Sequence, residues 1–300
     1  MNKQYIIYVF VAIMLFSIFG CSKEFNIIPD NAPIQLVVEG EVTNLAPPYY
    51  IRLTKSFNKQ VKPNFSGNSF DDETEPVTNA IVTLSDDKGN IETLSYVGLL
   101  NSKYSDGWYK SENIIGVVGG TYTLKINYDN KTYKSVSTLP QPVTIDSVSF
   151  KEKYLAAKNS TVYIPLIYFR DPASVKNYYL IHYLIDGMMG SNRVWPYSVL
   201  DDKYITEYVN GLEVDDGQSA DGKDFYSELY SGMGVTVVLE SVNQSTYNFY
   251  KSIIDQFNAD GGAFSSIPST PISNIDGALG HFKTSYVSQK TKVFNMLNRR

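Results

Sequence analysis

Short segments in which apolar and polar residues alternate recur along most of the chain, and clusters of Gly, Pro, Asn and Asp separate them. The clearest segment runs from Tyr122 to Tyr128, and residues 129–131 follow it as a hairpin turn. Alternation with a period of two places neighbouring side chains on opposite faces of a strand, so that one face can enter a core. Residues 34–140 contain several such strands, which predicts an N-terminal β-sandwich.

The second half of the chain begins after a stretch with two prolines, Leu139 to Val143. Residues 143–300 again contain strand-like segments, the last of them at 278–282, and predict a second β-rich domain. Apolar residues recur at intervals of three and four at Tyr247, Tyr250, Ile254 and Phe257. That spacing marks one face of a helix. We therefore predict one principal helix near 246–258, with Ser245 as its N-cap and the apolar residues in the core.

Two stretches of the second half, 211–224 and 261–277, are rich in Gly, Asp or Pro and predict long loops. Loops on a rigid scaffold tolerate variation in shape, so we expect a ligand to bind near them. Asn274 and Asp276 lie in the second loop and are expected to form turns and not to bind a ligand. The sequence assigns no ligand-binding residue.

The N-terminus combines a basic residue, Lys3, with an apolar run over residues 5–19. The run is shorter than the roughly 20 residues that cross a bilayer, and it suits a signal peptide. Ile18 and Gly20 then precede Cys21, which resembles the lipobox of bacterial lipoprotein signals. We therefore predict that residues 1–20 are a cleaved signal peptide.

Cys21 is the only cysteine of the chain and is predicted to be the lipid-modified first residue of the mature protein. Its acyl chains, palmitate among them, would hold the protein on the membrane, because two or three chains anchor far more firmly than one. The alternatives are an ordinary signal peptide or an uncleaved anchor with a cysteine there by chance. Residues 21–33 predict a tether, in which Lys23 and Glu24 also resemble the charged residues that mark lipoproteins for surface display.

The charge and the cysteine content exclude several classes of function. The net charge is −5, and no basic run occurs beyond Arg299 and Arg300. Nucleic-acid binding requires a basic patch, so we expect no nucleic-acid partner. One cysteine allows no disulfide framework, no thiol catalysis in the folded body and no cysteine-rich zinc site. The 24 tyrosines are explained by packing in strands, with a tyrosine-lined ligand surface as the alternative.

Short motifs occur in a fixed order along residues 36–285: Leu36 to Gly40, Ile51 to Thr54, Asn79 to Leu84, Gly120 to Leu124, Arg170 to Pro172, Gly261 to Gly262 and Gly277 to Gly280. This order resembles the Bacteroidota lipoproteins grouped as domain-of-unknown-function family 4249. The resemblance implies an outer-membrane lipoprotein on the periplasmic face or the cell surface, in a family often associated with TonB-dependent receptors. It implies no activity. Residues 77–138 also resemble the transthyretin-like sandwich of carboxypeptidase regulatory domains, so the N-terminal sandwich is expected to be of the immunoglobulin or transthyretin-like type.

The two histidines, His182 and His281, both lie in predicted strands. Each is expected to be a hydrogen-bonded histidine of a sheet and not a general base or a metal ligand, because a metal site needs several ligands that converge. Asp215, Asp216, Asp221 and Asp224 could in principle bind calcium, but their spacing does not fit the EF-hand pattern, and a solvated turn explains them better. No metal and no cofactor is therefore expected.

The sequence contains no nucleophile elbow, phosphate loop or zinc-protease motif. We therefore expect a non-catalytic binding or accessory module of the cell envelope, with a glycan, a peptide or a TonB-dependent transporter as its partner. One alternative is a hydrolase that uses carboxylates such as Asp171, Asp215 or Asp216. The other alternative is a purely structural scaffold.

Overall fold

The computed structural model describes residues 33–56, 75–98, 106–155, 159–172, 175–187, 198–205, 207–214, 229–257 and 271–295. Within these ranges the chain is mainly β, as the alternating pattern predicts, with one α-helix and a short 3-10 turn. None of the helices in these ranges is long and apolar enough to cross a membrane. Cys21, the predicted signal peptide, Asp215, Asp216, Asp221, Asp224 and Gly261 to Gly262 lie outside the described residues.

The strands form three sheets. The nine-stranded sheet has the order β13 (Ser198–Asp201), β12 (Tyr178–Ile185), β15 (Gly234–Val242), β16 (Leu279–Val293), β1 (Leu36–Thr43), β2 (Tyr49–Lys55), β7 (Trp108–Ser111) and β6 (Ser95–Val97), with β3 (Glu75–Pro76) paired to β2. The four-stranded sheet has the order β5 (Ile91–Thr93), β4 (Ile81–Asp86), β8 (Thr121–Tyr128) and β9 (Lys131–Thr138). The three-stranded sheet has the order β10 (Ile145–Leu155), β11 (Ser160–Arg170) and β14 (Tyr208–Glu213). The helices are α2 (Gln244–Phe257) and the 3-10 turn η2 (Asp202–Tyr204).

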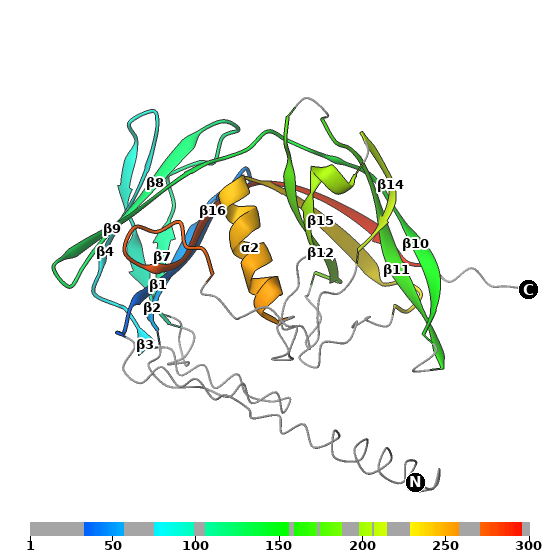
Figure 1. Cartoon of the computed structure of the whole chain (residues 1–300), viewed down its shortest axis with the longest axis horizontal. Coiled ribbons are helices and arrows are strands. Elements are labelled where there is room, and N and C mark those ends of the chain that lie inside the picture. Colours follow the sequence, from blue (N-terminus) through cyan, green and yellow to red (C-terminus); the bar gives the residue numbers. More distant parts are fainter. Residues whose placement is uncertain are drawn as a thin grey trace, which may run out of the picture. The chain divides into compact units, whose positions relative to one another are not determined.

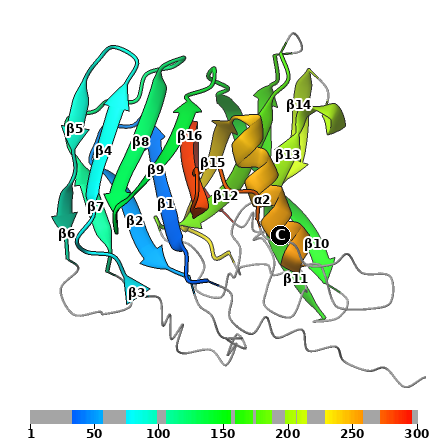
Figure 2. The same cartoon turned by 60° about the vertical axis from the view of Figure 1, so that its left-hand side comes forward.

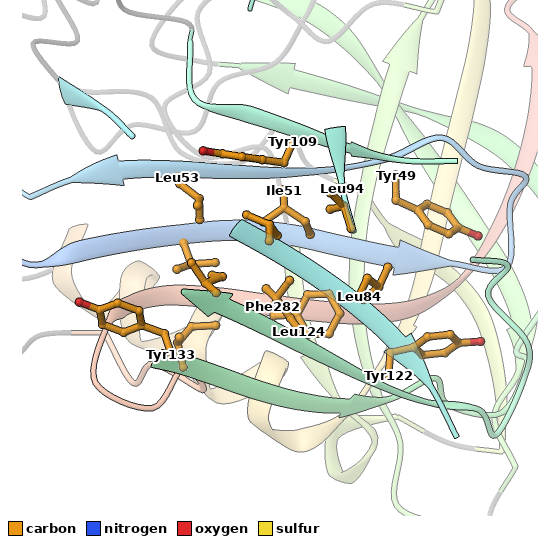
Figure 3. Close-up of a cluster of buried hydrophobic side chains, with 14 of the residues drawn as sticks. Tyr49, Ile51, Leu53, Leu84, Leu94, Tyr109, Tyr122, Leu124, Tyr133 and Phe282 are labelled. Atoms are coloured by element: carbon orange, nitrogen blue, oxygen red, sulfur yellow. The ribbon is translucent and has the colours of Figure 1, made fainter. Parts of the chain in front are cut away.

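The four-stranded sheet encloses a hydrophobic core with β1, β2, β7 and β16 of the nine-stranded sheet (Figure 3). The side chains labelled there come from both sheets and, for Leu94, from the link between β5 and β6. All are almost completely buried: Tyr49, Ile51, Leu53, Leu84, Leu94, Tyr109, Tyr122, Leu124, Tyr133 and Phe282. The alternation of side chains along a strand explains which residues are buried here, because every second residue of β2 and of β8 enters this core. The two sheets thus face each other in a sandwich-like arrangement.

The three-stranded sheet packs in the same manner on the other end of the nine-stranded sheet, through a second core. Every second residue of β12 and β15 contributes to it: Tyr179, Ile181, Tyr183, Val235, Val237 and Leu239. Val148 of β10 and Phe169 of β11 contribute from the facing sheet. The alternate residues of β12 and β15 therefore point to the opposite face of the nine-stranded sheet.

Strand β16 connects the two halves of the chain, because it pairs antiparallel with β15 and parallel with β1. At Gly280 the backbone φ is 95°, and an added Cβ would lie 2.0 Å from the carbonyl oxygen of Val38. Only glycine fits this close approach. The strand predicted at 278–282 continues to Val293. Because it pairs with both β1 and β15, the nine-stranded sheet contains strands from both sides of the prolines at 140–142. The division into two domains at that point stays a prediction.

Helix α2 packs against β12, β13 and β16 (Figures 1 and 2). Its observed range agrees with the predicted range near 246–258, but the predicted N-cap was wrong. The cap is Asn243, whose Oδ1 accepts a hydrogen bond from the backbone N–H of Thr246 at 2.9 Å. Ser245 is exposed and lies within the first turn. Asn243 was the better candidate because it directly follows the strand and its amide also donates to Ser137 of β9.

The predicted loop at 211–224 was wrong at its start, because residues 211–213 belong to β14. They pair with β11, where Leu212 lies opposite Ile167 and packs against the second core. The glycine at 211 suggested a loop, but its positive φ of 80° is accommodated beside a register shift in the strand pair. Residues 215–224 lie outside the described residues.

Candidate functional site

A cleft of about 670 Å³ lies on the face of the nine-stranded sheet that carries α2. Its floor comes from β1, β2, β7 and β16, and its wall comes from α2 and the turn at 45–48. The floor residues are the alternate ones along each strand, since their neighbours enter the sandwich core on the other side. The fold thus exposes on this face the side chains that the core does not use.

Aromatic rings line much of the cleft: Tyr50, Trp108, Phe249 and Tyr250. Tyr50 meets Trp108 edge to face at 6.3 Å between ring centroids. Phe249 meets Tyr250 in the same manner at 5.4 Å. Aromatic faces of this kind can stack on a ligand or attract a cation.

A buried ion pair lies beneath the cleft. Nζ of Lys283 lies 2.5 Å from a carboxylate oxygen of Glu240, and each side chain is 6% exposed. The same ammonium group lies 2.9 Å from Glu41, whose side chain is 50% exposed at the cleft surface. Lys283 is thereby held between two carboxylates. Its charge is largely balanced inside the protein, because a buried charge needs close partners.

A second exposed carboxylate, that of Glu39, lies on the same face of β1 as Glu41. Its side chain is 58% exposed, and Arg52 approaches it at 3.8 Å. Arg52 also lies over the ring of Trp108, at 5.7 Å from the centroid. The charged groups that the cleft exposes to solvent are therefore mainly carboxylates.

His281 lines the cleft but is buried beneath Phe249, with the two rings stacked at 4.7 Å. Its Nε2 forms a hydrogen bond of 2.9 Å with the hydroxyl of Thr246 in α2. Its Nδ1 has no hydrogen-bond partner among the described residues. Burial and the nearby Lys283 lower the pKa of His281 to about 3, so the ring is neutral and only weakly basic at physiological pH.

A smaller cavity of about 230 Å³ adjoins the cleft and shares Glu39 and Phe249 with it. Its other lining residues are mostly apolar: Val37, Pro271, Leu279 and Gly280. Of the loops in which a ligand was expected, the described residues contribute only Pro271 to either space. The described lining of the cleft therefore comes from the sheet, from α2 and from the turn at 45–48, whereas residues 215–224 and 261–270 of the predicted loops lie outside the described residues.

Most candidate residues from the sequence analysis hold strands and loops together, where the structure describes them. His182 lies buried in β12 and His281 in β16, with β15 between the two strands, so both are sheet histidines as predicted. Asn274 exchanges two hydrogen bonds of 2.8 Å with the backbone of Phe282. Asp276 forms an isolated β-bridge with Lys134 of β9, in which its backbone N–H donates to the carbonyl oxygen of Lys134. Asp276 lies in a turn that is closed by a hydrogen bond of 3.3 Å from the N–H of Ala278 to the carbonyl oxygen of Ile275, as predicted. Asn274 instead ties the loop to β16.

Asp171, a carboxylate of the hydrolase alternative, lies buried outside the cleft. It accepts hydrogen bonds from the hydroxyl of Tyr179 and the side-chain amide of Asn177. Burial and this hydrogen bond raise the pKa of Tyr179. The described residues contain no cluster of three or more His, Cys, Asp or Glu side chains that could hold a metal ion.

Of α2's predicted core residues, Tyr247 is buried. Tyr250 is partly buried: it packs against the cluster that contains Tyr247 and also forms part of the cleft wall. Ile254 is also partly buried. Sequence reasoning missed the cleft residues Trp108 and Lys283, and also Glu240, the buried partner of Lys283. Glu240 had a usable signal, because it is the only charge in the apolar strand at 235–242, and a charge at a buried position requires a partner.

These features define a mainly β protein with an aromatic and acidic cleft beside its α-helix. The chain belongs to the family described as Domain of unknown function (DUF4249), which it matches over residues 22–291. No curated protein matches the chain.

Proposed function

We propose that this chain is a binding module that is lipid-anchored in the outer membrane through Cys21 and holds its ligand in the cleft between β1, β2, β7, β16 and α2. The observation that carries the proposal is the cleft itself. Its volume of about 670 Å³ lies within the range of small-molecule and peptide-side-chain sites. It joins several aromatic rings to a few polar groups, which is the usual composition of such sites.

The rigidity of the floor supports binding at this face. The floor belongs to hydrogen-bonded strands, and the ion pair between Lys283 and Glu240 holds β16 to β15 at its base. A site on strands and a helix is positioned more precisely than a site on loops. A ligand therefore meets a surface that is already formed.

The lipobox around Cys21 and the family resemblance support a position beside a TonB-dependent transporter. In that setting, the module would capture a ligand and deliver it to the transporter. Pull-down from solubilised outer membrane tests this part. Recovery of a TonB-dependent receptor is expected, and repeated failure to recover one would leave the module without the proposed partner.

The hydrolase alternative has a carboxylate pair in the cleft, since Glu39 and Glu41 project from the same face of β1. Glycoside hydrolases use such a pair, one carboxyl group as general acid and the other as base or nucleophile. However, the general acid of such enzymes sits in an apolar pocket that keeps it protonated. Here both carboxylates are half exposed, and each has a cation nearby. Binding therefore fits this arrangement better than catalysis.

Replacing Trp108 with Ala tests the binding site by calorimetric titration against panels of glycans and peptides. We expect a ligand that binds the parent chain to bind the variant at least about tenfold more weakly, as for a buried aromatic anchor. Tyr154→Ala is the matched control, because Tyr154 is a 61% exposed aromatic residue on β10, outside the cleft. Equal losses in the two variants would argue against the cleft.

A further inference from the structure

The cleft and the smaller cavity form two compartments with a common border. Glu39 and Phe249 line both, so a ligand that passes them can fill both. The compartments differ in chemistry. The larger one exposes carboxylates and aromatic rings, whereas the smaller one is lined by Val37, Leu279, Pro271 and the ring of Phe249, with Glu39 at its edge. A ligand that suits both must carry a polar and an apolar group.

The charges around the larger compartment favour a cation, because three carboxylates, those of Glu39, Glu41 and Glu240, outnumber the two cations, Arg52 and Lys283. Lys283 cannot offer its charge to an anion without disturbing its contacts at 2.5 Å to Glu240 and at 2.9 Å to Glu41. Glu39 and Glu41 are 58% and 50% exposed and lie on the same face of β1. An anionic ligand would meet these carboxylates as like charges, whereas an ammonium or guanidinium group would be attracted.

The aromatic rings of the cleft are also compatible with a cation. The chain's own cations already lie over two of them: Arg52 over Trp108 at 5.7 Å, and Lys283 over Tyr250 at 6.0 Å. Such rings gain energy from a cation over the face of the ring. Tyr50, at 43% exposure, extends the aromatic surface at the rim.

The apolar compartment distinguishes a peptide from a sugar. Sugars present hydroxyl groups nearly everywhere, and burying them against Val37 and Leu279 would leave them without hydrogen-bond partners. A peptide can place an aliphatic side chain there while a neighbouring basic side chain enters the larger compartment. Anchors of this kind, on alternate or adjacent residues, are how grooves read peptides.

We propose that the two compartments together bind a peptide segment in which a Lys or Arg side chain contacts Glu39 and Glu41 while a nearby aliphatic side chain fills the cavity beside Phe249. This inference rests on the proposed binding function and specifies its ligand class. It requires no change in the fold, because both compartments are already present.

The test uses calorimetric titration of the full chain with acetylated, amidated peptides that hold Lys or Arg beside Leu, in both orders and with one Ala between them. Each has a counterpart with Gln for the basic residue, one with Glu, and one with Ser for Leu. We expect the basic, aliphatic peptides to bind at least about tenfold more tightly than each counterpart, which is the effect of losing one anchor. Equal binding of the Gln and Lys peptides would overturn the proposal.

Variants of the chain test which residue attracts the basic side chain of the peptide. Glu39→Gln is expected to weaken binding of the Lys peptide. The affinity for the Gln peptide, which is already lower, should not change. Glu152→Gln is the matched control, since it removes one exposed carboxylate from β10, outside both compartments. Glu39→Lys should further reverse the preference in favour of the Glu peptide. Thermal melting of each variant verifies that the fold is retained, and a folded Glu39→Gln variant with unchanged selectivity would contradict the assignment.

Two further ligands separate failure of this inference from failure of the proposed function. Neutral oligosaccharides that bind in a manner sensitive to Trp108→Ala, without any peptide binding, would overturn the peptide inference and leave the binding function standing. Spermidine that binds as tightly as the peptides would show that the cavity beside Phe249 adds nothing, which also overturns the peptide inference. Absence of binding to peptides, oligosaccharides and spermidine alike would count against both.

Discussion

The ammonium group of Lys283 and the carboxylate of Glu240 are 2.5 Å apart beneath the cleft, and each side chain is 6% exposed. Lys283 belongs to β16 and Glu240 to β15, so the pair joins two central strands of the nine-stranded sheet. Both residues are on the face that carries α2, opposite the sandwich cores. The pair supports the floor on which the exposed carboxylates lie.

Breaking this pair should destabilise the protein strongly. Lys283→Met leaves the carboxylate of Glu240 buried without its cation, which costs about 3–5 kcal/mol in comparable cases. The double variant Lys283→Met with Glu240→Leu should recover most of that loss, because no buried charge remains. Chemical denaturation measures both. Lys251→Met is the control: its pair with Asp255 lies exposed on α2 at 2.9 Å, and its loss should cost no more than about 0.5 kcal/mol.

His281 should make stability depend on pH below neutrality. Its pKa falls from 6.5 to about 3 on folding, so between these values the unfolded chain binds a proton that the folded chain does not. Stability therefore rises with pH across this window and is lost as the pH falls, by at most about 1.4 kcal/mol per pH unit. Denaturation of the parent and of His281→Gln across the window should give a shallower slope for the variant. Identical slopes would mean that His281 titrates normally.

The cap of α2 can be tested with two neighbouring residues. Asn243→Ala removes the 2.9 Å bond to the N–H of Thr246 and the 2.9 Å bond to Ser137, so we expect a loss of about 1–2 kcal/mol. Ser245→Ala, at the exposed position first predicted to be the cap, should change stability by less than about 0.5 kcal/mol. Thermal melts of the two variants compare them directly, and a larger loss for Ser245→Ala would restore the original assignment.

Asp171 should prove structural. Tyr179→Phe removes the hydroxyl that donates to its buried carboxylate, leaving the amide of Asn177 at 3.2 Å, and should cost about 1–3 kcal/mol. Tyr154→Phe, which removes a 2.7 Å bond to Asn159 on the exposed surface, should cost almost nothing. Denaturant midpoints measure both losses. A Tyr179→Phe protein of unchanged stability would contradict this role.

Cys21 can be tested by fractionation of cells that express the chain. Cys21→Ala should appear in soluble form or keep its signal peptide, because no acyl chain can be attached. Mass spectrometry of the parent should show diacylglycerol on Cys21 and the loss of residues 1–20. A membrane-bound Cys21→Ala protein with the mature mass would exclude the lipid anchor.

Local patterns in the sequence were sufficient for much of the secondary structure. The alternation from Tyr122 to Tyr128 predicts β8, and the spacing of Tyr247 and Tyr250 predicts α2, because each records which side of one element faces a core. Ser245 was mistaken for the cap because its side chain is a good cap in isolation, while the actual cap also depends on Ser137 in a distant strand.

The cleft was decided by strand pairing that the sequence does not display. Asn44 forms hydrogen bonds with the backbone of Val287, 243 positions along the chain, and β1 lies parallel to β16 in the same region. An alternating pattern determines which side chains share a face of one strand, but it does not select the neighbouring strand. Only that choice brings Glu41 to Lys283 and makes α2 and Trp108 line the same cleft. The sequence by itself therefore determined the elements and their buried faces, and tertiary pairing determined which exposed faces meet to form a site.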